Sequence, residues 1–103
     1  MTRERAASSG NESLGEERTW VHPRIPARHP ELTEQDVVTA WEMRYRFRMR
    51  AGDQADRQVA LGYDGHHREL ELIARRTDDG WVVYHAMSPP TKKVLRELGM
   101  IGG

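Results

Sequence analysis

The chain has 103 residues, no cysteine, and 16 Lys and Arg residues that balance 16 Asp and Glu residues. This length suits one domain, and the lack of cysteine excludes disulfides and thiolate metal sites. The zero formal net charge does not by itself indicate nucleic acid as a partner. No apolar run approaches the roughly 18 residues of a membrane span, and no signal-peptide core is evident, so we expect a cytoplasmic protein without membrane contact.

The first part of the chain differs from the rest in composition. Residues 1–19 are mostly small, polar or charged, and such a segment cannot bury enough apolar surface to offset the entropy of ordering it. We therefore expect a disordered tail over residues 1–19, a single domain over residues 20–99, and a short C-terminal tail over residues 100–103.

Two helical segments are expected before any strand. Residues 21–32 carry three prolines, which permit at most a short helical turn with Ile25 and Ala27 facing inward. A longer helix follows, with Thr33 as its N-cap and Asp36 completing a capping box. Its apolar stripe is formed by Val37, Val38 and Trp41.

The pattern changes to a period of two in "RYRFRMR", residues 44–50, which predicts a strand. One face carries four arginines, and the other carries an aromatic and apolar set that we expect in the core: Arg44, Arg46, Arg48 and Arg50, against Tyr45, Phe47 and Met49. Four guanidinium groups on one face repel each other unless negative charge lies opposite. That charge is either Glu69 and Glu71 in cross-strand ion pairs, or a bound phosphate.

Three further strands and a helix complete the expected fold. The strands at residues 57–64 and 68–76 flank an Asp64-Gly65 hairpin turn, and a third strand covers residues 81–87. The last helix has Ser88 as N-cap, with Pro89 following it and Gly99 beyond its end. The pattern predicts an α+β fold with one or two N-terminal helices, an antiparallel sheet of three to four strands and a C-terminal helix.

Lys92 and Lys93 stand near the start of the last helix, where the helix dipole disfavours positive charge by about 0.3–1 kcal/mol. One interpretation is that both lysines are solvated and the cost is tolerated. The other is that the helix start binds a phosphate, which the lysines and the backbone N–H groups would attract together.

His85 lies near the end of the last predicted strand. We expect it on one face with Trp81 and Val83, while Val82, Tyr84 and Ala86 share the other face. It is either a hydrogen-bonded structural residue or a proton-transfer group, since histidine titrates near neutral pH. The five histidines show no zinc-ligand spacing, so we expect no metal and no other cofactor.

Three segments, read together, resemble a known family: "RHPELTEQDVVTAWEM", "DRQVALGYDGHHRELELIARR" and "WVVYHAMSPPTKKVLRELG". They are similar to the BrnT-type toxins of bacterial toxin–antitoxin pairs, which are relatives of the RelE-like ribonucleases. The resemblance covers about residues 20–99. It would include an N-terminal strand, which we expect here to be absent or reduced to Trp20, and a last strand with an ending different from "YHAM".

The resemblance implies a metal-independent endoribonuclease that an antitoxin protein holds inactive. The family pattern implies three site residues. They are Arg28 and His29, which precede the helix, and Arg57, which begins a strand. The local chemistry described above adds the other candidates. His85 would be the acid or base and Lys92, with Arg57, would clamp the phosphate. Glu71 would be a second proton carrier. The additional phosphate-binding cations would be Arg44, Arg46, Arg48 and Lys93.

Two alternatives to a ribonuclease remain open at this point. The same fold could be a non-catalytic domain that binds an acidic protein segment or a nucleic acid through its arginines. Salt-dependent binding without turnover would distinguish that case. The chain could also be a small domain without any active site.

Overall fold

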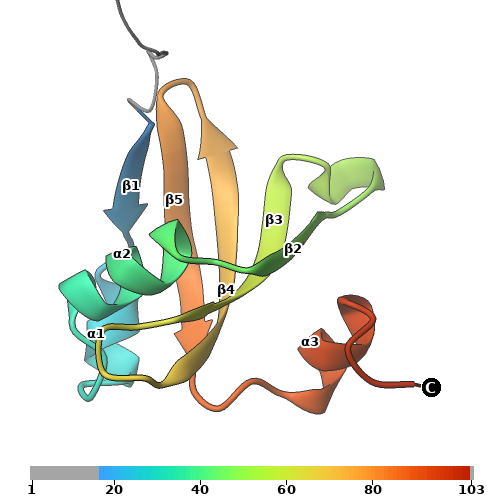
Figure 1. Cartoon of the computed structure of the whole chain (residues 1–103). Helices are drawn as coiled ribbons and strands as arrows, with labels where there is room; N and C mark the ends of the chain where they lie inside the picture. Colours follow the sequence, from blue (N-terminus) through green and yellow to red (C-terminus); the bar gives the residue numbers. More distant parts are fainter. Residues whose placement is uncertain (1–16, 103) are drawn as a thin grey trace, which may run out of the picture.

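The computed structural model describes residues 17–102, which form an α+β fold around one mixed five-stranded sheet (Figure 1). The strand order is β1-β5-β4-β3-β2, in which β1 runs parallel to β5 and all other neighbours are antiparallel. The elements are β1 (Arg18–Val21), α1 (Arg24–Arg28), α2 (Glu34–Glu42), β2 (Arg46–Met49), a 3-10 turn (Gly52–Gln54), β3 (Arg57–Tyr63), β4 (Glu69–Thr77), β5 (Gly80–Met87) and α3 (Lys92–Glu97).

The strand β1 corrects two expectations. The chain has an N-terminal strand that is more than Trp20, and it begins at Arg18, inside the segment expected as a tail. It is also the fifth strand, where three or four antiparallel strands were expected. Because β1 pairs with β5 across some 60 residues of sequence, no hairpin signal marks the pairing. The rest of the expected tail, residues 1–16, lies outside the described residues. Within residues 17–102, no helix is long and apolar enough to cross a membrane.

The two faces of the sheet are covered by different helices. Ala60 of β3 belongs to the larger core cluster, which contains Val37, Ala40 and Trp41 of α2. Its neighbours Val59 and Leu61 belong to a smaller cluster with Val94 and Leu98. Since successive residues of a strand point to opposite faces, α2 and α3 cover opposite faces. Figure 1 shows α1 and α2 together near β1 and β5, and α3 at the opposite side of the molecule.

The N-terminal helices form largely as the sequence predicts. The Thr33 hydroxyl accepts from the Asp36 N–H at 3.1 Å, and the Asp36 carboxylate accepts from the Thr33 N–H at 2.9 Å, so the expected capping box is confirmed. Ile25 of α1 is buried as expected, whereas Ala27 is exposed. A helix of only five residues turns one narrow face to the core, and Ile25 occupies it.

Gly62 of β3 lies directly beneath α2. A Cβ atom at this position would lie 2.0 Å from the backbone oxygen of Ala40. Neither backbone segment can avoid this clash unless α2 moves away from the sheet. We expect Gly62→Ala to reduce the free energy of unfolding by about 3 kcal/mol or more. Urea unfolding would measure this, with Gly65→Ala as control, because a Cβ at Gly65 meets no atom within 4 Å. Equal stability of the two variants would contradict the close packing.

The segment 44–50 departs from expectation. The strand β2 covers only Arg46–Met49, and all four of its residues are exposed. Tyr45, Phe47 and Met49 were expected in the core, but their exposed fractions are 46%, 55% and 44%. The reason is position: β2 is the edge strand furthest from β1, and none of the helices within residues 17–102 covers the face that carries Phe47 and Met49.

A bulge in β5 also overturns the expected distribution of its side chains. Ile73 of β4 pairs with His85, but the next residue, Ala74, pairs with Val83, so Tyr84 has no partner. Val83 and Ala86, on either side, both belong to the core cluster beneath α2. The extra residue therefore turns Tyr84 and His85 to the opposite face together, and His85 does not share a face with Trp81 and Val83.

The last helix starts later than expected. Its N-cap is Thr91, whose hydroxyl accepts from the Val94 N–H at 3.3 Å, and Lys92 is the first helical residue. Ser88, expected as the N-cap, instead donates its hydroxyl to the Glu69 carbonyl oxygen at 2.7 Å. Gly99 follows the helix with φ of 72°, as its expected place beyond the end requires.

Candidate functional site

A cleft rich in arginine extends from the sheet face opposite α2, past β5, to α1. It consists of two adjoining hollows that share Arg24 and Tyr84. We call it the basic cleft; it is lined by His22, Arg24, Ile25, Arg28, His29, Arg57, Arg75, Val82, Tyr84, His85 and Ala86. None of these lining residues is acidic, and four of them carry guanidinium groups. Such a lining attracts an anion from outside the chain.

Arg57 and Arg75 form an unusual pair in this cleft. They lie directly opposite each other on β3 and β4, where like charges destabilise a sheet. Within residues 17–102, the carboxylate that lies within ion-pair distance of Arg57 is that of Asp56, with an oxygen 3.8 Å from the Arg57 Nε atom, beyond hydrogen-bond distance. The Nε–H of Arg57 is buried and has no hydrogen-bond partner among the described residues. A phosphate between the two guanidinium groups would relieve both costs.

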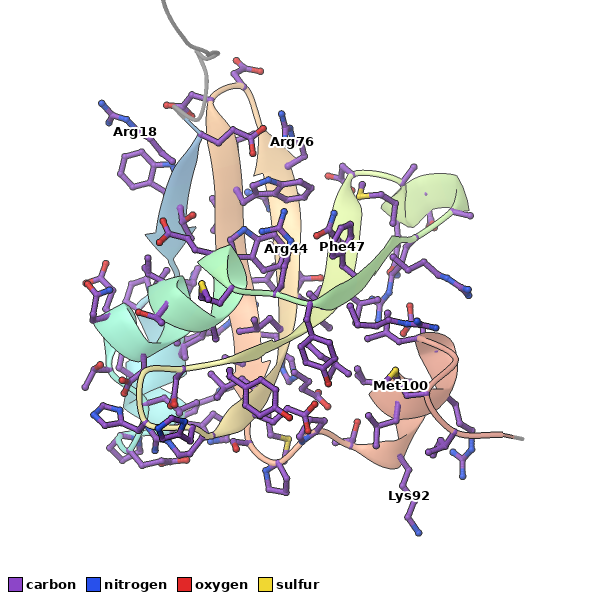
Figure 2. All side chains as sticks on the ribbon, viewed as in Figure 1. Arg18, Arg44, Phe47, Arg76, Lys92 and Met100 are labelled. Atoms are coloured by element: carbon purple, nitrogen blue, oxygen red, sulfur yellow. The ribbon has the colours of Figure 1, made fainter. Side chains whose placement is uncertain are left out.

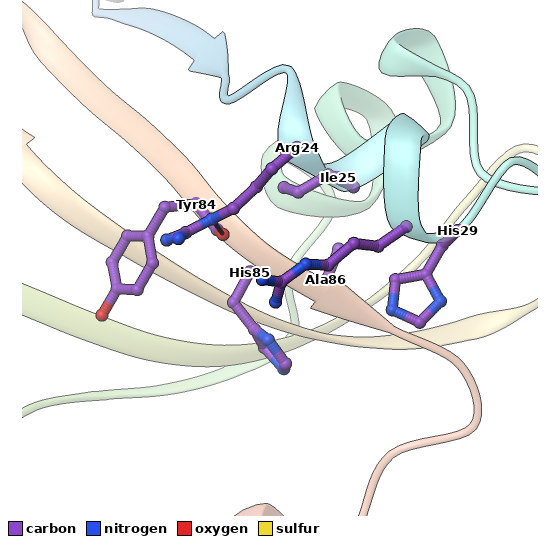
Figure 3. A pocket seen from close by; sticks show the side chains of 7 residues that line it. Arg24, Ile25, His29, Tyr84, His85 and Ala86 are labelled. Atoms are coloured by element: carbon purple, nitrogen blue, oxygen red, sulfur yellow. Dashed lines mark hydrogen bonds between the residues drawn. The ribbon is translucent and has the colours of Figure 1, made fainter.

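Tyr84 connects the two hollows of the basic cleft. The guanidinium carbons of Arg24 and Arg57 lie 5.7 Å and 5.8 Å from the centre of its ring, within the range of cation–π contact. Arg24 also donates from Nε to the Tyr84 carbonyl oxygen at 3.1 Å (Figure 3). These contacts fix two cations from distant parts of the chain around one aromatic ring.

His85 borders the basic cleft and is held by Glu71 of β4. Its Nε2 atom lies 2.7 Å from one Glu71 carboxylate oxygen. The other oxygen accepts from the N–H and the hydroxyl of Thr91, at 2.7 and 2.8 Å. Burial of Glu71 acts to raise its pKa, but the hydrogen bonds from His85 and Thr91 outweigh burial and leave the pKa below the ordinary value. Glu71 is therefore an ionised carboxylate at neutral pH, and it is only 3% exposed.

The charge on Glu71 determines which nitrogen of His85 carries the ring hydrogen. An ionised carboxylate only accepts hydrogen bonds, so Nε2 of His85 carries a hydrogen. The neutral ring then has its lone pair on Nδ1, which can accept a proton. His29, at the end of α1, lines the same part of the cleft, and Figure 3 shows both imidazoles beside the same hollow. The cleft thus brings two histidines together with several arginines.

Glu71 also accounts for the lysines at the start of α3. Its carboxylate supplies the negative charge that a helix start favours, because it accepts from the N–H of the N-cap residue Thr91. Lys92 and Lys93 are exposed, and neither lines the basic cleft. Figure 2 shows Lys92 extending from α3 away from the sheet. The expected clamp of Arg57 and Lys92 on one phosphate is therefore not assembled within the described residues.

The arginines of residues 44–50 do not line the cleft or share one face. Arg44 lies on the α2 side, where it donates to Gln58 and stacks over Trp41 and Phe47. Arg46 donates to the Leu98 carbonyl oxygen at 2.9 Å. Arg50 forms an ion pair with Glu97, the last residue of α3, through two hydrogen bonds. Arg46 and Arg50 thus fasten α3 to the sheet. The expected partners of the arginines form hydrogen bonds with other residues: Glu69 accepts from the Tyr45 hydroxyl, and Glu71 accepts from His85.

A second cluster of titratable groups lies at the β3–β4 turn. Asp36, Asp64 and His66 place ligand atoms within 4.8 Å of one another, as a metal site would. However, Arg68 donates to both carboxylates, at 3.1 Å to Asp36 and 2.8 Å to Asp64. Its guanidinium occupies the position that a cation would take, so the cluster is a structural ion-pair network that joins the turn to α2.

Sequence reasoning found part of this site. The basic cleft contains four of the expected site residues, namely Arg28, His29, Arg57 and His85, and Glu71 contacts it through His85. Sequence reasoning missed His22, Arg24, Arg75 and Tyr84. The hairpin register would have identified Arg75, because it lies opposite Arg57 when the strands are paired outward from the turn. No comparable signal marks Tyr84, since the bulge that exposes it has no residue signature.

Comparisons with known proteins add no relative. Neither a protein-family model, nor a curated protein, nor a solved structure matches the chain. The chemistry of the basic cleft is therefore the basis on which a function can be inferred.

Proposed function

We propose that this chain is a metal-independent endoribonuclease, the toxin of a toxin–antitoxin pair that resembles the BrnT-type toxins. One observation carries the proposal: a histidine oriented by a buried carboxylate borders a cleft with four guanidinium groups and no lining carboxylate. RNA cleavage through its own 2′-hydroxyl needs a proton acceptor and cations around the phosphate. The element order, with two helices before an antiparallel meander and a final helix, is in keeping with the resemblance.

The proposed reaction uses the groups of the cleft in named roles. Nδ1 of His85 accepts the proton of a ribose 2′-hydroxyl, and the 2′-oxygen attacks the adjacent phosphorus atom. The bond from phosphorus to the 5′-oxygen breaks, and His29 delivers a proton to that leaving oxygen, so a 2′,3′-cyclic phosphate forms. Arg57 and Arg75 stabilise the charge that develops on the phosphate oxygens. Glu71 was expected to carry a second proton; its burial and its bond to His85 favour an orienting role instead.

The proposal includes a partner. A toxin of this kind is held inactive by an antitoxin protein, which we expect to cover the basic cleft. An open reading frame beside the gene, encoding a helix-turn-helix or ribbon-helix-helix pattern, would favour this assignment.

The test is incubation of the purified chain with a labelled single-stranded RNA in EDTA. We expect cleavage, which Arg57→Ala and Arg75→Ala each reduce by at least tenfold, with a salt dependence of RNA binding that falls by about one counterion per arginine removed. Lys92→Ala is the matched control, because Lys92 does not line the cleft, and it should cleave like the unaltered chain. Equal losses in all three variants would refute the cleft as the site.

A second candidate function is RNA binding without cleavage. It is favoured by Tyr84, whose ring, flanked by Arg24 and Arg57, offers a stacking surface beside phosphate-binding groups. In this case the RNA stays intact under every condition, and binding weakens with salt and with Arg57→Ala. Cleavage by the unaltered chain in EDTA would exclude it.

A further inference from the structure

A different surface, at the opposite edge of the sheet from β1, presents both apolar and positive side chains. Five of the eight large hydrophobic residues that are exposed within residues 17–102 lie on β2, in the segment that leads into it, or at the end of the neighbouring β3, namely Met43, Tyr45, Phe47, Met49 and Tyr63. Within the same residues, Arg44, Arg46 and Arg48 form no ion pair with a carboxylate. A group of exposed apolar side chains such as this one often marks an interaction site.

The backbone of β2 is also unpaired on its outer side. Among the described residues, 17–102, the strand pairs only with β3, and the Arg50 N–H donates to the Arg57 carbonyl oxygen at 2.9 Å. Hydrogen-bonded pairs alternate along an antiparallel ladder, so Arg46 and Arg48 direct their backbone groups toward β3. The backbone groups of Phe47 and Met49 therefore point outward, away from the sheet. β2 contains no proline, and its register with β3 has no bulge from Arg46 to Met49, so two of the usual devices that block an edge are missing over this stretch.

We propose that the outer edge of β2 binds an extended, acidic segment of another protein as a sixth strand. The edge offers the outward N–H and C=O groups of Phe47 and Met49 for main-chain hydrogen bonds. Residues directly opposite each other in a sheet lie on the same face. The partner's residues opposite Arg46 and Arg48 are therefore acidic, and those opposite Phe47 and Met49 are apolar. The partner strand alternates between Glu or Asp and an apolar residue.

Charge distinguishes this occupant from two others. In a pairing of β2 with a second copy of itself, the outward residues Phe47 and Met49 meet each other, which places arginines of one chain opposite arginines of the other. Such like-charge pairs are destabilising. An RNA strand would match the arginines, but it has no groups that continue the ladder of backbone hydrogen bonds at Phe47 and Met49.

The first test uses two synthetic peptides of equal composition. One alternates, Glu-Val-Glu-Ile-Glu-Val, and in the other the three glutamates stand together. In an NMR titration we expect the alternating peptide to bind at least tenfold more tightly and to slow hydrogen exchange of the Phe47 and Met49 amides at least tenfold. Equal binding of the two peptides, shifts confined to Arg24, Arg57 and Arg75, or stronger protection of the same amides by RNA or by self-association would each overturn the proposal.

Variants separate the backbone from the side chains. Met49→Pro removes an outward N–H that β3 does not use, an arrangement that an edge strand tolerates. We expect it to abolish binding of the alternating peptide, while Met49→Ala retains most of it. If Met49→Pro does not fold, Arg48→Glu provides the second variant. The Arg48→Glu variant should no longer bind the acidic peptide and should instead bind a peptide in which lysine replaces glutamate. Loss of binding without this exchange of preference would overturn the assigned register of charges. None of these residues lines the basic cleft, so RNA cleavage should be unchanged.

Discussion

Replacing His85 with alanine is expected to reduce RNA cleavage by about 10²–10⁴-fold, the usual contribution of a positioned acid or base. RNA affinity should change little, because the arginines proposed to hold the phosphates remain. The reason lies in the geometry, in which Glu71 holds Nε2 of His85 at 2.7 Å and leaves Nδ1 for the 2′-hydroxyl. Single-turnover cleavage in EDTA measures the rate, and an RNA with a 2′-deoxy substitution at the cut measures the affinity.

The matched control for this experiment is His67→Asn. His67 is exposed in the β3–β4 turn, where its φ of 65° is a value that asparagine adopts more readily than most residues. This variant should cleave at the unaltered rate. Full activity of His85→Ala would contradict the assignment and would leave His29, in the same cleft, as the candidate base.

Replacing Glu71 with alanine should have the largest effect on stability of any change near the site. Glu71 is buried, and its loss would leave the Thr91 N–H and the His85 Nε2–H without their acceptor. We expect a loss of about 3 kcal/mol in the free energy of unfolding at pH 7, since an unpaired buried polar group costs roughly 1–3 kcal/mol. Urea unfolding would measure the loss. A loss below about 1 kcal/mol would show that water replaces the carboxylate.

Glu71→Gln separates charge from hydrogen bonding. The pKa of Glu71 in the folded chain lies below its ordinary value of 4.5, so the unfolded chain takes up this proton first as the pH falls. The carboxylate therefore stabilises the fold above pH 4.5, and this contribution is lost as the pH falls through the folded pKa. The difference in stability between Glu71→Gln and the unaltered chain should shrink over that range. A constant difference would show that another group causes the acid sensitivity.

The same variant tests whether Glu71 positions His85. The glutamine amide can donate to Nε2 of His85, which would place the ring hydrogen on Nδ1 and block the proton acceptor. We therefore expect Glu71→Gln to fold at pH 7 but to lose most of its RNA cleavage. If Glu71 only stabilised the fold, the folded Glu71→Gln variant would cleave RNA at the unaltered rate.

Local signals in the sequence identified those elements that local chemistry determines. The capping box at Thr33 and Asp36, the three strands from β3 to β5 and the place of Gly99 all follow from neighbouring residues. The sequence could not show which face of a strand is covered. Phe47 and Met49 alternate with arginines as core residues would, yet no helix reaches them at the sheet edge. Only the tertiary arrangement decides that outcome.

The site was predicted in its residue types more than in its arrangement. His85 and Arg57 were identified as candidates, but the bulge at Tyr84 changes which residues accompany them. The phosphate expected at Lys92 and Lys93 was inferred from the dipole of α3, and Glu71 supplies that negative charge from β4. A contact between residues 20 positions apart leaves no local trace in the sequence.

The parallel pairing of β1 with β5 also bears on the synthesis of the protein. Arg24 and His29 follow β1 directly, whereas His85 and Thr91 belong to the last fifth of the chain. A ribosome releases the N-terminal part first, and contacts between distant segments form late in folding. The basic cleft and the orientation of His85 therefore cannot be complete on a nascent chain until the residues up to Thr91 have left the ribosome. The ribosome that makes this protein is therefore not exposed to the proposed RNA cleavage while the residues up to Thr91 are still being synthesised.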